Sequence, residues 1–245
     1  MIFAWTAVAV LVLITGTFAI AVRRRRYDTI DSAWGLGFAV IAVLTCLLSP
    51  GPPLPRLLVT GLTAVWGLRL SVHIALRNHG SGEDRRYARM PRRPTRMFVR
   101  VYLTQAVVMW VVSLPVQVAQ FATPSPGLLI AGVAVWLLGF VFETVGDHQL
   151  RRFRAASTGG VLDTGLWRYT RHPNYFGDAC VWWGLYLLAC HSWLAAATIV
   201  SPLIMTALLA HGSGKPMLER DLVERRPEYA DYVRRTSGFL PLPPK

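Results

Sequence analysis

Residues 164–178 combine cationic, aromatic and amide side chains in a pattern that predicts a nucleotide site. A guanidinium binds phosphate through two parallel hydrogen bonds, and aromatic rings stack on a base. Pro173 is typical of a helix start, whose positive dipole end favours anions. The groups concerned are Arg168, Arg171, His172, Asn174 and Asp178, with the rings of Trp167, Tyr169 and Tyr175. Because the sequence has no Gly-x-Gly-x-x-Gly or phosphate-loop motif, we expect a cofactor site without a Rossmann fold.

A charged stripe precedes this cluster. Glu143, Asp147, Arg151 and Arg154 recur at helical spacing, so they share one face if the helix continues beyond its apolar part. Two interpretations of the stripe remain open. It is either an extension of the nucleotide site or a solvated helix face.

Ionisable residues also occur inside apolar segments, where each costs roughly 3 kcal/mol and needs a partner or a function. Asp31 opens the second apolar segment, and Arg69 lies in the third. Glu143 and Asp178 stand at the edges of two later segments. Arg69 is therefore predicted either to form a buried ion pair with one of these acids or to line a substrate pocket.

The composition shows which elements must position these residues. Of 245 residues, 53% are hydrophobic and 16% are charged, against roughly 25% charged in a soluble domain. We therefore expect an all-α, polytopic membrane protein with a cytoplasmic cofactor-binding face. It would form a single membrane domain over residues 1–245, with substrate-side helices in 1–121 and the cofactor half in 122–245. The seven predicted spans are 2–21, 33–49, 57–76, 98–121, 127–146, 177–190 and 193–210.

The basic residues predict the orientation of these spans. The net charge is +13, and 24 of the 26 lysines and arginines fall in segments that a seven-span chain places on one side. The positive-inside rule makes that side cytoplasmic and leaves the N-terminus outside. This distribution argues against nucleic-acid binding, and the short loops suggest a bacterial inner membrane. The three cysteines lack metal-ligand spacing, so no metal site is expected.

Several motifs resemble the steroid 5-alpha-reductase-like superfamily, in particular its bacterial DUF1295 branch. Residues 169–178 read Tyr-Thr-Arg-His-Pro-Asn-Tyr-Phe-Gly-Asp, and further similarity lies at 182–184 and in the tail at 216–220, 226–229 and 239–241. The N-terminal segments 31–38, 66–70 and 82–87 also resemble that branch. A similar Arg-His-Pro-x-Tyr string occurs in isoprenylcysteine carboxyl methyltransferases, which use S-adenosylmethionine.

The resemblance implies a seven-helix bundle whose cytoplasmic loops and tail fold over NADPH, with a lipid-accessible substrate cavity in the earlier helices. It implies that Asn174 and Asp178 hold the nicotinamide carboxamide. Asp147, Arg151 and Arg154 match positions that bind the nucleotide and its phosphates, and Glu219 matches an acid in the tail. Trp167, Tyr169, Arg171, His172 and Tyr175 complete the expected cofactor set.

The substrate side departs from the superfamily pattern. Steroid reductases polarise an enone carbonyl with a Glu and Tyr pair, whereas the corresponding tyrosine position lies near Trp66, which has no acidic proton. We expect Asp31 to replace the glutamate and Arg69 to stabilise a developing enolate by its charge. Glu83 is a second candidate proton donor, in addition to Asp31. Alternatively, Glu83 belongs to a solvated loop.

Three functions remain open from the sequence. The first is an NADPH-dependent reductase of an activated carbon–carbon double bond in a lipid-soluble substrate. The second is an S-adenosylmethionine-dependent lipid or prenyl methyltransferase, which has less need of paired arginines because that cofactor has no phosphate. The third is a non-enzymatic lipid-binding membrane protein. Each interacts with membrane lipids, and none implies an obligate protein partner.

Overall fold

The protein is all-helical in the part of the chain that the structure describes, as the sequence predicts. The computed structural model describes residues 1–88, 90, 93–156, 159–212, 219 and 228–245. Lys215 and most of the tail motifs at 216–220 and 226–229 lie outside these residues, although Glu219 is described. The chain divides into two compact units, Met1–Ser125 with Leu188–Thr198 and Pro126–Leu187 with Ile199–Lys245. The prediction of a single domain stays a prediction.

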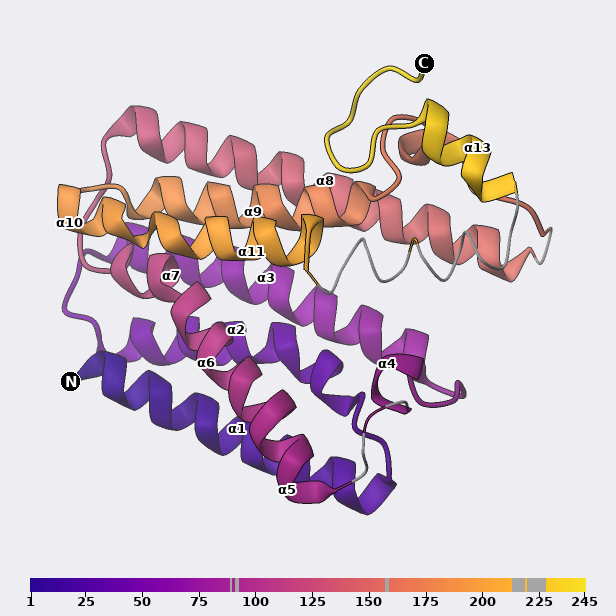
Figure 1. Ribbon diagram of the computed structural model, residues 1–245. Coiled ribbons are helices and arrows are strands. Elements are labelled where there is room, and N and C mark those ends of the chain that lie inside the picture. Colours follow the sequence, from indigo (N-terminus) through magenta and orange to yellow (C-terminus); the bar gives the residue numbers. More distant parts are fainter. Residues whose placement is uncertain (89, 91–92, 157–158, 213–218, 220–227) are drawn as a thin grey trace. The chain divides into compact units, whose positions relative to one another are not determined.

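Three long helices form the framework of the first unit: α1 (Ile2–Arg24), α2 (Thr29–Leu48) and α3 (Pro53–Asn78). Figure 1 shows them as the indigo-to-purple helices, with α2 packed against both others. Gly35 of α2 and Gly67 of α3 lie at the closest approach, where a Cβ at Gly35 would stand 2.1 Å from the Gly67 carbonyl oxygen. Glycine is therefore required at this crossing, because any side chain would force the backbones apart.

Gly35→Ala is expected to destabilise the α2–α3 pair strongly, by about 2–4 kcal/mol, since the clash is with backbone that has no rotamer to change. Thermal unfolding of the purified protein in detergent measures the loss. Gly61→Ala is the matched control, because nothing lies within 4 Å of a Cβ there. Equal stability of the two variants would show that the crossing is not tightly packed.

The predicted fourth span, 98–121, is not one regular helix. It is divided into α5 (Pro94–Met97), a π-helical turn η1 (Phe98–Leu103), α6 (Thr104–Val112) and α7 (Leu114–Val118). The interruption at Ser113 precedes Pro115, which lacks the N–H that a continuous helix needs. In η1, the Tyr102 hydroxyl donates to the Tyr27 carbonyl at 2.8 Å. Short α4 (Arg85–Ala88) and α10 (Trp193–Ala196) also belong to this unit.

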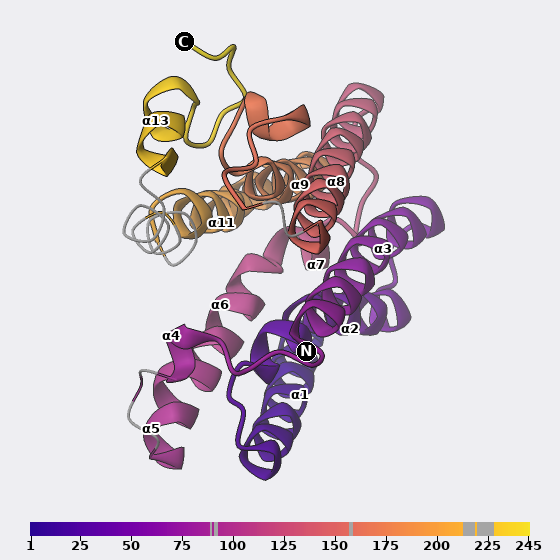
Figure 2. The same ribbon diagram turned by 90° about the vertical axis from the view of Figure 1, so that its right-hand side faces the viewer.

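The second unit is built on α8 (Pro126–Ala155), α9 (Pro173–Ala189) and α11 (Val200–Ala210). Both ribbon views show these helices side by side (Figures 1 and 2). α8 and α9 approach closely at Gly139 and Gly177, where a Cβ on either would lie 2.5 Å from the other's carbonyl oxygen. The 3₁₀ turn η2 (Gly165–Arg168) lies between α8 and α9 in the chain, and α13 (Glu228–Arg235) follows α11. Close packing of α8 on α9 fixes the positions of the polar residues at their ends.

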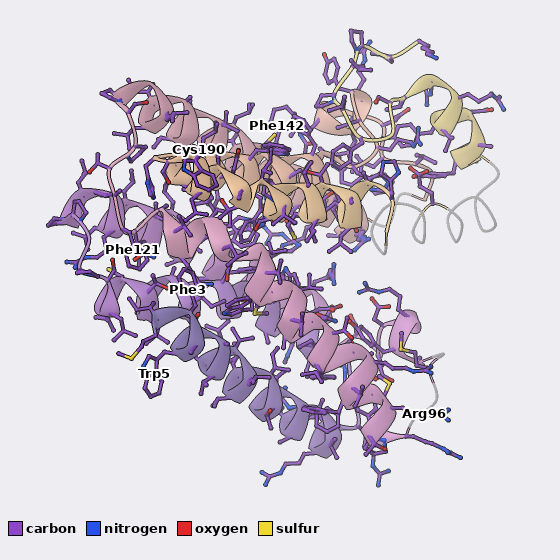
Figure 3. All side chains as sticks on the ribbon, turned by 60° about the vertical axis from the view of Figure 1, so that its left-hand side comes forward. Phe3, Trp5, Arg96, Phe121, Phe142 and Cys190 are labelled. Carbon is purple, nitrogen blue, oxygen red and sulfur yellow. The ribbon has the colours of Figure 1, made fainter. Side chains whose placement is uncertain are left out.

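The chain is an integral membrane protein. Five helical segments are long and apolar enough to cross a bilayer, namely 2–24, 29–48, 53–78, 126–155 and 193–210. The other two predicted spans correspond to the interrupted run at 94–118 and to α9, which has 17 residues. Large apolar side chains face outward from α1, including Trp5, which is 58% exposed (Figure 3). Such outward apolar side chains suit contact with lipid. The number of spans and the orientation of the termini stay predictions.

Candidate functional site

The charged stripe lies on a single helix, because α8 continues to Ala155. This confirms the helical continuity that the spacing required. Glu143 and Asp147 are buried, whereas Arg151 and Arg154 are exposed near the end of the helix. The Arg151 guanidinium lies 3.2 Å from Nδ1 of His148. The stripe therefore presents buried acids first and then two accessible cations.

The N-terminus of α9 carries the amide that the sequence singled out. The helix begins at Pro173, and the Asn174 side-chain amide donates to Oδ1 of Asp147 at 3.1 Å. Asp147 thus orients one N–H of Asn174, and within the described part of the chain the second N–H is left for another acceptor. Asp178 is buried and lies in the second turn of α9, because the helix begins at Pro173, four residues before the predicted span 177–190.

Arg171, His172 and Glu219 form a compact ionic cluster, which we call the tail clasp. The Arg171 guanidinium donates to both carboxylate oxygens of Glu219, at 2.8 and 3.2 Å, and Nε2 of His172 lies 3.0 Å from Oε1. The His172 ring also stacks on Tyr175, with centroids 5.2 Å apart. The clasp ties the segment before α9 to the C-terminal part of the chain.

The remaining donors of Arg171 are also bonded within the protein. Its Nη1 donates to the carbonyl oxygens of Val233 and Thr236, and its backbone N–H donates to that of Ser237 at 2.9 Å. A guanidinium has only five N–H donors. Arg171 is therefore engaged in holding the chain together, which leaves it little capacity to bind a phosphate.

The charge of Glu219 is stabilised by its partners. Burial by itself raises the pKa of this carboxyl group, but hydrogen bonds from His172 and Arg171, together with their positive charge, outweigh burial and lower the pKa to about 2. Glu219 is therefore ionised at neutral pH. An ionised carboxylate is what a bidentate arginine contact requires.

Two aromatic residues of the motif have different surroundings. Trp167 is buried, and its indole N–H donates to the Gly146 carbonyl on α8 at 3.1 Å. The Tyr232 hydroxyl donates to the Trp167 carbonyl, which holds α13 to the same turn. Tyr169 is 44% exposed; its backbone N–H donates to the Leu166 carbonyl at 3.1 Å, and its carbonyl accepts from the Leu242 N–H at 3.0 Å. Trp167 thus anchors the loop, whereas the Tyr169 ring is accessible.

The first unit contains a second polar cluster, centred on Asp31. Oδ1 of Asp31 accepts a 2.6 Å hydrogen bond from the Tyr87 hydroxyl, and Oδ2 accepts from the Arg86 guanidinium at 2.7 Å. Arg86 also donates to both oxygens of Asp84. The carboxylate that opens α2 is therefore held by a phenol and a cation, both from α4.

Tyr87 is the residue that the sequence did not single out as functional. It is buried, and burial and the charge of Asp31 raise the pKa of its phenol, against the opposing effects of Arg86 and Gln105. The phenol therefore stays protonated near neutral pH. The signal available in the sequence was a tyrosine that ends the charged segment 82–87, but its partner Asp31 lies 56 residues away.

The other predicted substrate-side residues have different surroundings from the Asp31–Tyr87 pair. Trp66 is fully buried and packs on Phe38, with ring centroids 5.7 Å apart. The Glu83 carboxylate accepts a hydrogen bond from the Tyr27 N–H at 2.6 Å, which fixes the loop against the start of α2. Arg69 lies in α3 and is half-buried. Arg86, not Arg69, is the cation at Asp31.

The ionisable side chains of the described residues form small clusters of acids with cations, phenols or amides. The same described residues contain no group of three or more His, Cys, Asp or Glu side chains that could hold a metal ion. The polar clusters are instead built from acids, phenols, amides and guanidinium groups. These side chains suit proton transfer and the binding of an organic ligand.

Comparison with known proteins gives a family and several named relatives. A family model described as "Protein of unknown function (DUF1295)" matches residues 17–236. Over 82 residues the chain is 32% identical to "3-oxo-5-alpha-steroid 4-dehydrogenase 1" of Rattus norvegicus, which covers 33% of this chain and 30% of the relative. The protein of that name from Bos taurus is 38% identical over 66 residues, 26% of this chain and 24% of the relative. The matched segments thus span less than a third of these relatives. No solved structure matches.

Proposed function

The chain belongs to the DUF1295 family, and from this premise we propose that it is a membrane-embedded reductase that uses NADPH to reduce an activated carbon–carbon double bond. The name of the relatives describes oxidoreduction of a 3-oxo steroid, which supports this class of reaction. The proposed substrate is a lipid-soluble, steroid-like compound in which a carbonyl group activates the double bond. An apolar, membrane-spanning chain suits a substrate that partitions into lipid.

The observation that carries the proposal is the Asp31–Tyr87 pair. Adding hydride to the β-carbon of an enone places negative charge on the carbonyl oxygen, which a proton donor must stabilise. The Tyr87 phenol, which donates to Asp31 across 2.6 Å, can supply a proton to that carbonyl oxygen. The Arg86 guanidinium, 2.7 Å from the carboxylate, would stabilise the charge left on the pair. Methyl transfer and simple lipid binding have no need of such a donor.

The second unit offers groups that fit NADPH. Arg151 and Arg154 are exposed cations suited to its phosphates, and the second N–H of Asn174 is suited to the nicotinamide carboxamide. Asp147 would orient Asn174, and the ring of Tyr169 would stack on a base. When bound, NADPH supplies the hydride. We assign Trp167, Arg171, His172, Tyr175 and Glu219 to holding this site in shape, and Asp178 to the carboxamide side.

On the substrate side, we assign proton donation to Asp31 and Tyr87. Arg69, half-buried in α3, is assigned to the wall of the proposed substrate cavity, where its charge would stabilise a developing enolate. Trp66 would shape the cavity wall through its packing on Phe38. Glu83 would support the donor pair by fixing the loop that carries Tyr87.

The first experiment is the thermal stability of the detergent-purified protein with NADPH, NADH, S-adenosylmethionine or no addition. A ligand at 100 times its Kd stabilises the folded state by about 2.7 kcal/mol, so a bound cofactor gives a clear shift. We expect a shift with NADPH that is lost in Arg154→Ala and Asn174→Ala. Arg152→Ala is the matched control, because Arg152 is also exposed on the last turn of α8 but lies off the stripe.

The other outcomes would contradict the proposal in distinct ways. A shift with S-adenosylmethionine alone would replace reduction by methyl transfer. A shift with NADPH that persists in both site variants would disprove the assigned cofactor residues. No shift with any cofactor would favour a lipid-binding protein.

A further inference from the structure

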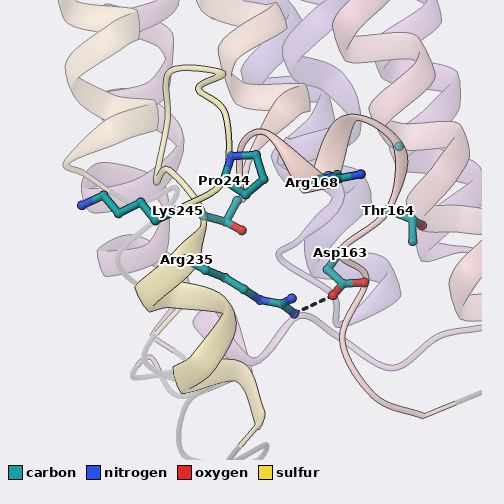
Figure 4. Close-up of a pocket in the computed structure, with 8 residues that line it drawn as sticks. Asp163, Thr164, Arg168, Arg235, Pro244 and Lys245 are labelled. Atoms are coloured by element: carbon teal, nitrogen blue, oxygen red, sulfur yellow. Dashed lines mark hydrogen bonds and ion pairs between the residues drawn. The ribbon is translucent and has the colours of Figure 1, made fainter.

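A separate pocket in the second unit carries an inference that does not rest on the proposed reductase. Its volume is about 480 Å³, within the range of small-molecule sites. One wall comes from η2 and the loop before it, and the other from the end of α13 with the C-terminal segment, as Figure 4 shows. The polar lining residues are Asp163, Thr164, Arg168, Arg235, Thr236 and Lys245. They share no member with the residues assigned to the cofactor under the proposed function, although the sequence pattern groups Arg168 with the predicted nucleotide site.

Hydrogen bonds hold each wall in place, and one of them joins the two walls. On one side, the Leu166 N–H donates to the Gln149 side chain at 3.1 Å, and Trp167 is anchored to α8. On the other side, the Lys245 N–H donates to the Arg235 carbonyl at 2.9 Å, and the Leu242 N–H donates to the Tyr169 carbonyl at 3.0 Å. The pocket is therefore preformed, so a ligand would pay little ordering entropy on binding.

The charges of the lining favour an anion. Its side chains include three cations and one acid, and that acid, Asp163, is already bonded to the Arg235 guanidinium at 2.6 Å (Figure 4). Arg168 is exposed, and within the described residues its guanidinium makes no hydrogen bond or ion pair. The Lys245 side chain extends away from the Asp163–Arg235 pair in Figure 4, so it contributes attraction over a longer distance. Arg168 is thus the main donor left for a ligand.

We propose that this pocket binds a phosphate monoester group, with Arg168 as its principal ligand. Such a group carries about two negative charges and three acceptor oxygens. The guanidinium fork of Arg168 and the hydroxyls of Thr164 and Thr236 offer several donors together, which match a group of three acceptor oxygens better than a carboxylate of two. Free phosphate and the headgroup of a phosphatidic acid share this chemistry.

The test titrates the full chain in detergent with inorganic phosphate and with dihexanoyl phosphatidic acid, using dihexanoyl phosphatidylcholine as the headgroup control. Calorimetry measures Kd at low and at raised ionic strength. We expect Arg168→Gln to raise Kd about tenfold, the loss of one charge-assisted contact, and Lys245→Gln to raise it less. Asp163→Asn should lower Kd, because it removes a negative charge without changing the shape. Raised salt should weaken binding.

Arg234→Gln is the matched control, because Arg234 is adjacent to Arg235 but is paired with Asp231 outside the pocket. Binding of both probes with similar Kd and this pattern of variants identifies a site for the phosphate group itself. Much tighter binding of phosphatidic acid than of phosphate identifies a lipid headgroup. The proposal is overturned if neither probe binds the folded protein, if Arg168→Gln binds as tightly as the original, or if Asp163→Asn weakens binding.

Discussion

Tyr87→Phe is expected to lower kcat/KM for an enone substrate by roughly 10²- to 10⁴-fold, the usual contribution of a positioned proton donor. The variant keeps the buried ring and removes only the hydroxyl that donates to Asp31 at 2.6 Å. Asp31→Asn should have a comparable effect, because the pair then loses its charge beside Arg86. NADPH consumption by the purified protein with a series of 3-oxo-4-ene steroids measures the loss.

Tyr102→Phe is the matched control for this prediction. Its hydroxyl is also buried in the first unit, but it donates to the Tyr27 carbonyl and not to Asp31. It should cost stability of about 1 kcal/mol, as for a lost buried hydrogen bond, with little change in turnover. If Tyr87→Phe turned over as fast as Tyr102→Phe, Tyr87 would have no place in the mechanism.

Arg171→Ala is expected to lower the free energy of unfolding of the second unit by about 3–5 kcal/mol. The variant removes both hydrogen bonds to Glu219 and those to the Val233 and Thr236 carbonyls, so among the described residues a half-buried carboxylate keeps only its His172 partner and two carbonyl oxygens lose the Arg171 donor. Denaturation in detergent followed by tryptophan fluorescence measures this loss. Arg234→Ala removes an exposed ion pair and should stay within about 0.5 kcal/mol of the original.

The same clasp predicts the direction of a pH dependence. The pKa of Glu219 is lowered to about 2 in the folded chain, so the folded state favours the ionised form. The stabilisation is present above the unfolded pKa, near the ordinary glutamate value, and is lost as the pH falls through the folded value. Glu219→Gln should remove this acid-dependent part of the stability. An unchanged acid profile in Glu219→Gln would place the titrating group elsewhere.

The sequence by itself determined the helical architecture and part of the candidate cofactor region. Apolar length predicted the long helices, Pro173 predicted the start of α9, and regular spacing predicted one helix through Glu143 and Arg154. These features are local, because helix formation depends on neighbours three and four residues apart and on the residues at the ends. The family resemblance was equally available, since it depends on short motifs.

Only the tertiary structure decided which polar residues act together. Tyr87 and Asp31 are far apart in the chain and meet because the loop before α4 is fixed at the start of α2 by Glu83. Residue type likewise suggested a phosphate ligand at Arg171, but its donors are used by Glu219 and two carbonyl oxygens. Whether a guanidinium binds its own chain or a ligand depends on the acceptors that folding brings within about 3 Å, and sequence spacing does not determine those contacts.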